Sequence, residues 1–115
     1  MINRILVVDK DIRWLDYVRS DLNKFEIVIA QDTETILSEL RSSVFDLVIA
    51  GSNYIPVIKT ALGEYPNQRF IIATVQPSTQ EALNVYRFGA IGYYSKSFRP
   101  QGLFNYVTEV IFTEQ

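Results

Sequence analysis

The sequence contains no cysteine and no histidine among its 115 residues. Without cysteine there are no structural disulfides or thiolate metal sites, and without histidine the usual general base and the commonest zinc ligand are missing. A Gly-rich phosphate-binding loop is absent as well. We therefore expect no enzymatic activity, no metal and no cofactor.

Runs of like charge and long apolar runs are also absent. Eleven basic and thirteen acidic residues give a net charge of -2, which favours neither nucleic acid nor an anionic membrane. Near the N-terminus the apolar run is residues 5–8, too short for a signal peptide or a membrane span. We expect a cytoplasmic protein with neither nucleic acid nor membrane as a partner.

Apolar residues make up 48% of the chain, enough for a core, and we expect residues 1–115 to form one domain. Short apolar runs predict buried strands at residues 4–8, 26–30, 46–53, 70–75 and 91–94. The third run, DLVIAGSN, has four apolar residues before Gly51, Ser52 and Asn53. It suits the centre of a parallel sheet that is covered on both faces.

Apolar residues three or four positions apart predict helices between these strands. The expected helices cover residues 12–24, 33–43, 57–63 and 79–88, and a last one begins at about Pro100. Asp11 is expected to cap the first helix. The inward stripe of that helix is predicted to consist of Ile12, Leu15, Val18 and Leu22, with Trp14 and Tyr17 outside it. Residues 54–56 predict a turn.

Strands that alternate with helical crossovers imply a parallel sheet with helices on both faces. Five such units favour the flavodoxin-like (βα)5 three-layer α/β sandwich, with strand order 2-1-3-4-5. In this order the connections diverge between the first and third strands, where ligands usually bind. Asp9, Lys10 and Gly51 are expected to meet there.

Four segments, ILVVDKD, FDLVIAG, FIIATV and GAIGYYSKSF, resemble in order and spacing the landmarks of the response-regulator receiver domain (CheY-like). The resemblance implies a third-strand aspartate that is phosphorylated from a histidine kinase. It also implies an acidic pair that holds Mg²⁺, a hydroxyl and a lysine that bind the phosphoryl group, and an aromatic residue on the fifth strand that reports the change.

Part of this pattern is present in the chain. The matching positions are Asp9 for the first acid, Thr74 for the hydroxyl, Tyr93 for the aromatic residue and Lys96 for the lysine. The departures are Gly51 in place of the acceptor aspartate, Lys10 in place of the second acid and Ser97 in place of the proline after the lysine. The chain thus resembles a pseudo-receiver without its phospho-acceptor.

Phosphoryl transfer would need a carboxylate nucleophile and a divalent ion, and Gly51 supplies no nucleophile. Lys10 would repel the ion by on the order of 8 kcal/mol before relaxation. Lys10 either pairs with Asp9 or nearby carbonyls, or extends into solvent. Thr74 and Lys96 are expected to be structural, with Lys96 as a partner for Asp9. Ser52 could accept a phosphate only with an activating base, and none is evident.

Any activity is then expected to be binding. Four tyrosines of the fourth helix, fifth strand and fifth helix lie on the face that receiver domains use to dimerise or dock: Tyr86, Tyr93, Tyr94 and Tyr106. Tyrosine is enriched in interfaces, although one of Tyr93 and Tyr94 should point into the core because strand residues alternate between faces. Trp14 with Tyr17 forms a competing patch.

Three functions remain open from the sequence. The first is a phosphorylation-independent protein-interaction module in two-component-type signal transduction, with a protein partner or a second copy on the tyrosine face. The second is a receiver-fold domain regulated by a small ligand at the degenerate site. The third, an unrelated flavodoxin-like enzyme, has no motif in its favour.

Overall fold

The computed structural model describes residues 3–113, which form a five-stranded parallel sheet in the order β2-β1-β3-β4-β5. The strands are β1 (Arg4–Val8), β2 (Glu26–Ala30), β3 (Leu47–Gly51), β4 (Phe70–Thr74) and β5 (Gly92–Ser95). The helices are α1 (Ile12–Asp21), α2 (Thr33–Ser42), the 3-10 turn η1 (Ser52–Tyr54), α3 (Ile55–Glu64), α4 (Thr79–Arg87) and α5 (Gly102–Thr113). The predicted flavodoxin-like topology is confirmed.

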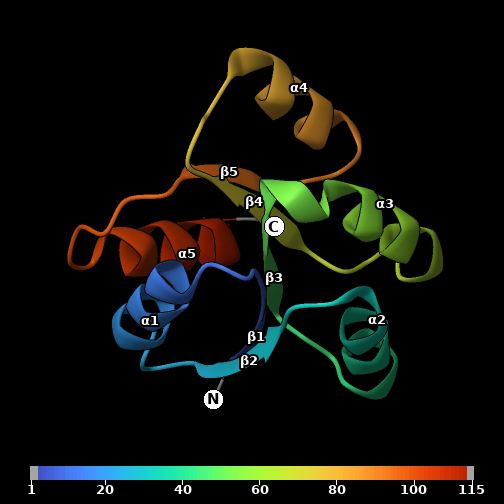
Figure 1. The fold of residues 1–115 in the computed structure, drawn as a ribbon, viewed down its shortest axis with the longest axis horizontal. Coiled ribbons are helices and arrows are strands. Elements are labelled where there is room, and N and C mark those ends of the chain that lie inside the picture. Colours follow the sequence, from blue (N-terminus) through green and yellow to red (C-terminus); the bar gives the residue numbers. More distant parts are fainter. Residues whose placement is uncertain (1–2, 114–115) are drawn as a thin grey trace.

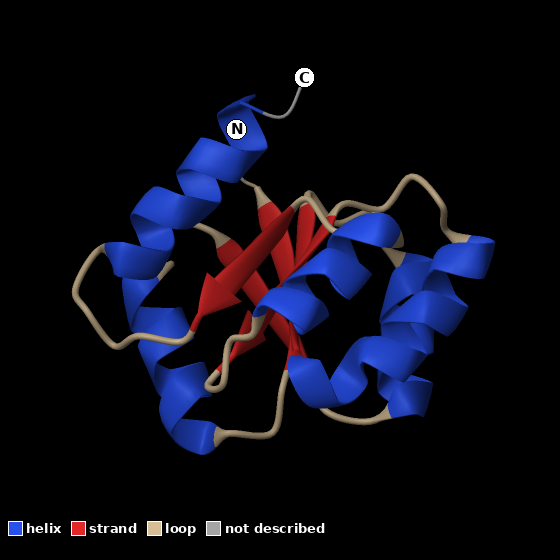
Figure 2. Cartoon of the chain, turned by 90° about the horizontal axis from the view of Figure 1, so that it is seen from above, coloured by secondary structure: helices blue, strands red, loops and turns tan. Residues whose placement is uncertain are grey.

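Helices cover both faces of the sheet. Figure 1 shows α1 and α5 on one side and α2 and α3 on the other, with α4 beyond β4 and β5. Figure 2, seen from above, shows the strands in red enclosed between the helices in blue. One buried cluster packs the sheet against α1 and α5, and a second packs it against α2, α3 and α4. Because the core lies in these two layers, the carboxyl ends of the strands are left free for a site.

The central strand β3 is buried along its whole length. It pairs with β1 and β4, in registers that place Val8 beside Ala50 and Gly51 beside Ala73. This continuous burial accounts for the unbroken apolar run in the sequence, because a strand covered on both faces has no solvent side. The register also brings Gly51 to the end of β1, as predicted.

The third helix is longer than the sequence suggests. Residues 54–56 were predicted to form a turn before a helix at 57–63, but η1 leads directly into α3 at Ile55. Pro56 lies in the first turn of α3. A proline is tolerated there because the first N–H groups of a helix have no intrahelical acceptor. The predicted turn was wrong for this reason.

The inward stripe of α1 also differs from the prediction. Trp14 is fully buried, whereas Ile12 is 70% exposed. Asp11 caps the helix as predicted, accepting the N–H groups of Arg13 and Trp14. A patch of Trp14 with Tyr17 on the surface is therefore excluded. Burial of a side chain of this size contributes about 1.5–3 kcal/mol or more.

The fifth helix begins at Gly102 rather than at Pro100, because Gln101 has a φ of 67° and interrupts the helical path. Side chains of α1 cap its start. Asp21 accepts the N–H groups of Gln101 (2.7 Å) and Phe104 (2.8 Å), and the Tyr17 hydroxyl accepts that of Leu103 (3.2 Å). These contacts hold α5 against α1.

None of the helices within residues 3–113 has the length and apolar character that crossing a membrane requires.

Candidate functional site

The residues singled out in the sequence meet at the carboxyl ends of β1, β3, β4 and β5. Asp9 follows β1, Gly51 ends β3, Thr74 ends β4 and Lys96 follows β5. All four line a pocket of about 260 Å³. The pocket lies at the ends of β1 and β3, where the chain leaves β1 toward β2 and leaves β3 in the opposite direction, toward β4. Ligands bind at this point in sheets of this type.

A buried ion pair dominates this site. Lys96 Nζ lies 2.8 Å from Asp9 Oδ2, and the two side chains are only 8% and 9% exposed. The other oxygen, Asp9 Oδ1, accepts the backbone N–H groups of Lys10 (2.8 Å) and Asp11 (3.0 Å). The Lys96 ammonium also lies 5.3 Å from the centre of the Trp14 ring. Each charge is thus held on two sides, as a buried charge requires.

The missing side chain at position 51 leaves room for this pair. A Cβ atom built on Gly51 would lie 2.8 Å from Asp9 Oδ2, closer than Cβ atoms approach other atoms in proteins. The Asp9 carboxylate therefore occupies the space in which a side chain at position 51 would begin. The absence of a side chain at position 51 and the direct pairing of Asp9 with Lys96 are sterically linked.

Lys10 contributes its backbone N–H to the site, and its side chain is exposed. The cation beside Asp9 is Lys96, so the predicted partnership of Asp9 with Lys96 is present, and that of the Lys10 ammonium with Asp9 is not.

The side chains do not fit the Mg²⁺ that the receiver resemblance implies. Mg²⁺ needs hard oxygen ligands in an octahedral arrangement. Both Asp9 oxygens are already engaged, and Asp11 Oδ1 accepts the helix N–H groups of α1. Within residues 3–113 no group of three acidic side chains is placed to hold a metal ion.

Thr74 and Ser97 each accept a backbone N–H two residues further along the chain. The Thr74 side chain is buried, and its Oγ1 accepts the N–H of Gln76 at 3.1 Å. Its carbonyl accepts the N–H of Lys96 at 2.7 Å, which fixes the start of the loop after β5. The bond from Lys96 to Ser97 is trans, as expected without a proline.

Glu81 at the start of α4 connects three elements at the rim of the pocket. Its Oε1 accepts hydrogen bonds from the Ser52 hydroxyl (3.1 Å) and from the Tyr93 hydroxyl (2.7 Å). The Tyr93 hydroxyl in turn accepts the N–H of Ser78 at 3.1 Å. Burial and the adjacent Glu81 carboxylate raise the pKa of Tyr93. The aromatic side chain on β5 is thereby attached to the first turn of α4.

Sequence reasoning missed Glu81, although a signal for it exists. Ser78 and Glu81 have the spacing of a capping box, in which the glutamate would accept the serine N–H. Here Ser78 Oγ accepts the N–H of Glu81 as expected, but the Tyr93 hydroxyl takes the serine N–H. The Tyr93 hydroxyl on β5 thus accepts the N–H that the Glu81 carboxylate would accept in a capping box. No local sequence pattern predicts this replacement.

The four tyrosines of the expected interaction face are not equivalent. Tyr94 is buried at 8% exposed, and Tyr86 is 48% exposed beside Leu83, which is 51% exposed. The Tyr106 hydroxyl points to the edge of β5, where it accepts the N–H of Tyr93 at 2.9 Å. Of the predicted set, Tyr86 is the side chain most available to a partner, and Tyr94 is part of the core.

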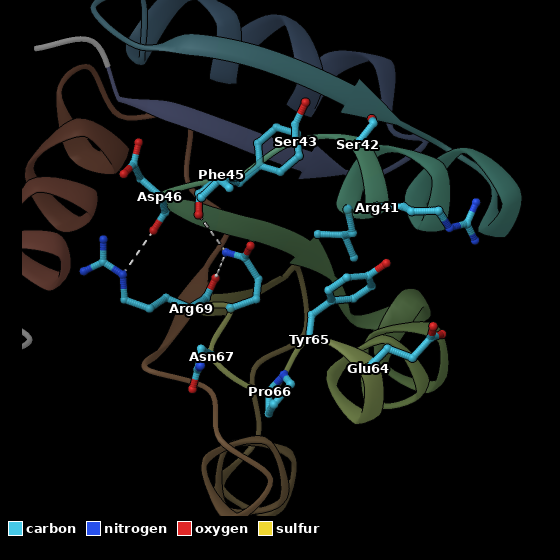
Figure 3. A pocket seen from close by; sticks show the side chains of 13 residues that line it. Arg41, Ser42, Ser43, Phe45, Asp46, Glu64, Tyr65, Pro66, Asn67 and Arg69 are labelled. Atoms are coloured by element: carbon cyan, nitrogen blue, oxygen red, sulfur yellow. Dashed lines mark hydrogen bonds between the residues drawn. The ribbon is translucent and has the colours of Figure 1, made fainter.

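A larger depression, of about 630 Å³, lies at the opposite end of the sheet (Figure 3). It is bordered by the segments before β3 and β4. Arg69 Nε donates to the Asp46 carbonyl (3.1 Å) and Gln68 Nε2 to the Phe45 carbonyl (3.1 Å). These side chains therefore connect the segment before β4 to the segment before β3. The smaller pocket around Asp9 and Lys96 is the better candidate site, because buried charged groups converge on it.

Comparison of the fold with solved structures gives a consistent class. A response regulator from Thermotoga maritima superposes with a TM-score of 0.87 at 24% identity, covering 97% of this chain and 99% of the other. A CheY-like receiver domain protein from Methanospirillum hungatei gives 0.85 at 21% identity, covering 99% and 97%. The T. maritima regulator TrrA, solved in complex with Mg²⁺ and beryllium fluoride, gives 0.79 at 23% identity, covering 95% and 99%.

These superpositions show that the chain has the fold of response-regulator receiver domains. No protein-family model matches the sequence, and no curated protein is detectably similar to it.

Proposed function

We propose that this chain is a receiver-fold module that works without phosphorylation and acts by binding a protein partner in two-component-type signalling. The observation that carries the proposal is the buried ion pair of Asp9 with Lys96 beside Gly51. The acceptor position has no side chain, and the lysine that would contact a phosphoryl group is already neutralised. Gly51 supplies no carboxylate nucleophile, and no group of acidic side chains within residues 3–113 is placed to hold a metal ion.

The exposed face of α4 is the favoured place for a partner. Leu83 and Tyr86 lie three residues apart on the helix and are about half exposed. Residues at this spacing form one apolar surface, and tyrosine is enriched at interface cores. The link from Tyr93 through Glu81 holds the start of α4 in one position. An α4 that is hydrogen-bonded to β5 in this way is consistent with a module that needs no activating signal.

The test is addition of Mg²⁺ and beryllium fluoride, a phosphoryl mimic, to the purified chain. Trp14 is the only tryptophan and lies beside Lys96, so its fluorescence reports any rearrangement at the site. We expect no change in fluorescence and none in sedimentation velocity over a concentration series. TrrA from T. maritima serves as the positive control, because its structure contains Mg²⁺ and beryllium fluoride. A saturable change in this chain would overturn the proposal.

A second candidate is regulation by a small ligand, which the pocket of about 260 Å³ favours. The pocket is slightly smaller than most small-molecule sites, which span roughly 300–1,000 Å³. Its lining includes the hydroxyl of Ser52 and the amide of Gln76. Native mass spectrometry of the purified chain tests this candidate directly. A bound small molecule that is lost in a Ser52→Phe variant would favour it over the protein-interaction function.

A further inference from the structure

The Lys96 ammonium in the pocket of about 260 Å³ has hydrogen-bond donors that the chain does not use. An ammonium group carries three N–H donors. It pairs with Asp9 Oδ2 at 2.8 Å, and the centre of the Trp14 ring lies 5.3 Å away. Among residues 3–113 no other oxygen accepts from Lys96 Nζ. Because the side chain is only 8% exposed, the remaining donors have little access to bulk water.

The Thr74 hydroxyl has an unused donor at the same pocket. Thr74 is 6% exposed, and its Oγ1 accepts the N–H of Gln76. Its own hydroxyl proton has no acceptor in the described part of the chain. Buried donors without an acceptor are rare in folded proteins because each one is costly. Lys96 and Thr74 therefore favour an oxygen-bearing group of a ligand, and a carboxylate is a strong acceptor of this kind.

A carboxylate of the protein borders the same pocket. Glu81 Oε1 accepts two hydroxyl groups, whereas nothing within residues 3–113 donates to Glu81 Oε2. One of these hydroxyls belongs to Ser52, which directly follows β3, and β3 pairs with β4 as far as Ala73. The free oxygen of Glu81 is thus held near Thr74 and its unused donor.

The charges around the pocket limit the class of ligand. Two carboxylates, of Asp9 and Glu81, and the ammonium of Lys96 line it, so its formal charge is negative. Asp9 Oδ2 is shielded from solvent, which leaves Lys96 and Glu81 as the charged groups that a ligand can contact. Glu81 would repel a simple anion, and a simple amine would leave Lys96 and Thr74 without an acceptor. A molecule with one carboxylate and one ammonium group satisfies both ends.

We propose that this pocket binds a free α-amino acid with a short, uncharged side chain. The ligand carboxylate accepts from Lys96 Nζ and the Thr74 hydroxyl, and the ligand ammonium donates to Glu81 Oε2. The pocket is smaller than most small-molecule sites, which span roughly 300–1,000 Å³, and this size suits a small amino acid. The inference rests on the small-ligand function proposed above and names the class of ligand.

The first test is titration of the purified chain with glycine, L-alanine, L-serine and L-threonine. Trp14 fluorescence reports binding, because its ring lies beside Lys96, and calorimetry confirms it. We expect a saturable change with at least one of the four. For L-alanine the matched analogues are L-lactate, which lacks the ammonium, and isopropylamine, which lacks the carboxylate. Each should bind at least tenfold more weakly, since each loses hydrogen bonds between charged groups.

Glu81→Gln tests the role of the carboxylate. Glutamine keeps an oxygen that can accept the hydroxyls of Ser52 and Tyr93 but removes the negative charge. The variant should bind the amino acid at least tenfold more weakly and L-lactate no more weakly than before. Glu34→Gln is the matched control, because Glu34 lies in the first turn of α2 as Glu81 does in that of α4. It should bind like the unmodified chain, and circular dichroism verifies both folds.

The proposal is overturned if none of the four amino acids gives a saturable change. It is equally overturned if L-lactate binds as tightly as L-alanine, or if a folded Glu81→Gln variant binds the amino acids unchanged. Native mass spectrometry separates this failure from that of the small-ligand function. A bound molecule of another class would refute the amino acid alone, whereas no bound molecule and no response to any of these compounds would refute both.

Discussion

At the scale of single residues, Gly51, Asp9 and Lys96 form one steric and electrostatic unit. The carboxylate of Asp9 lies where a side chain at position 51 would begin, and the Lys96 ammonium neutralises it. A change at any one of the three positions therefore alters the other two. Buried ion pairs do not necessarily stabilise a fold, but removing one partner leaves an uncompensated charge.

We predict that Lys96→Met lowers the free energy of unfolding by about 3–5 kcal/mol, because it leaves the buried Asp9 carboxylate unpaired. The double variant Asp9→Asn with Lys96→Met should recover most of the loss. Urea unfolding measures both. Lys10→Met is the control and should change stability by no more than about 0.5 kcal/mol, since its side chain is exposed. A loss for Lys10→Met as large as that for Lys96→Met would contradict the assigned pairing.

Gly51→Ala is expected to destabilise the protein by about 1–3 kcal/mol, because the new methyl group would force Asp9 out of its ion pair. In an Asp9→Ala background the same substitution should cost much less, which a double-mutant cycle would reveal. Gly63→Ala in α3 provides the control. A Cβ atom there meets nothing within 4 Å, so stability should rise by about 0.5–1 kcal/mol.

At the scale of elements, the joining of α5 to α1 is the least local feature of the fold. Asp21 on α1 accepts two N–H groups at the start of α5, and the Tyr17 hydroxyl donates to the Arg99 carbonyl at 2.6 Å. The start of a helix normally takes its cap from the residue just before it. Gln101, with its positive φ, precedes α5, and the capping groups come from another helix.

Replacing Asp21 by alanine should therefore destabilise the protein by about 1–2 kcal/mol, the typical cost of losing a helix cap. Hydrogen exchange in the first turn of α5 should accelerate more than exchange in α2. Asp16→Ala is the matched control on the same helix, because Asp16 makes only an exposed pair with Arg19 at 3.4 Å, worth about 0–1 kcal/mol. Equal effects of the two variants would argue against the interhelical cap.

At the scale of the whole molecule, aromatic side chains connect the layer of α1 and α5 to β5. Trp14 stacks on Tyr17 and contacts Tyr94, and Tyr94 contacts Tyr106. Burial raises the pKa of Tyr17 and that of Tyr106 to about 12 from the usual 10.0. Both phenols are therefore held neutral by the fold at pH values where free tyrosine ionises.

These shifts predict an alkaline limit to stability. A group whose pKa is raised on folding stabilises the protein fully below its unfolded pKa, and this contribution is lost as the pH rises through the folded value. Unfolding free energies should therefore decline between about pH 10 and about pH 12. Urea titrations at successive pH values, with ultraviolet absorbance to follow tyrosinate, would measure the decline. Stability that stays constant through this window would contradict the assigned burial of Tyr17 and Tyr106.

Much of the architecture could be predicted from local patterns. The strand order, the cap at Asp11, and the meeting of Asp9 with Gly51 at the strand ends are all as expected. The predictions that were wrong concern which face of α1 points inward and where helices begin near a proline. Trp14 packs against Tyr94 of β5 and Phe98 of the loop after β5, and the period of α1 alone does not indicate these contacts.

The sequence by itself determined the five βα units, the absence of a side chain at position 51 and the absence of histidine and cysteine chemistry. Hydrophobic periodicity and turn residues act between near neighbours, so they can be read along the chain. Only the tertiary structure decided between Lys10 and Lys96 as the partner of Asp9, which the sequence left open, and placed the Tyr93 hydroxyl in the cap of α4. It also decided that Asp21 accepts the N–H of Gln101, 80 positions later, at the start of α5. Such contacts depend on how packed layers bring distant segments together, and no local pattern specifies them.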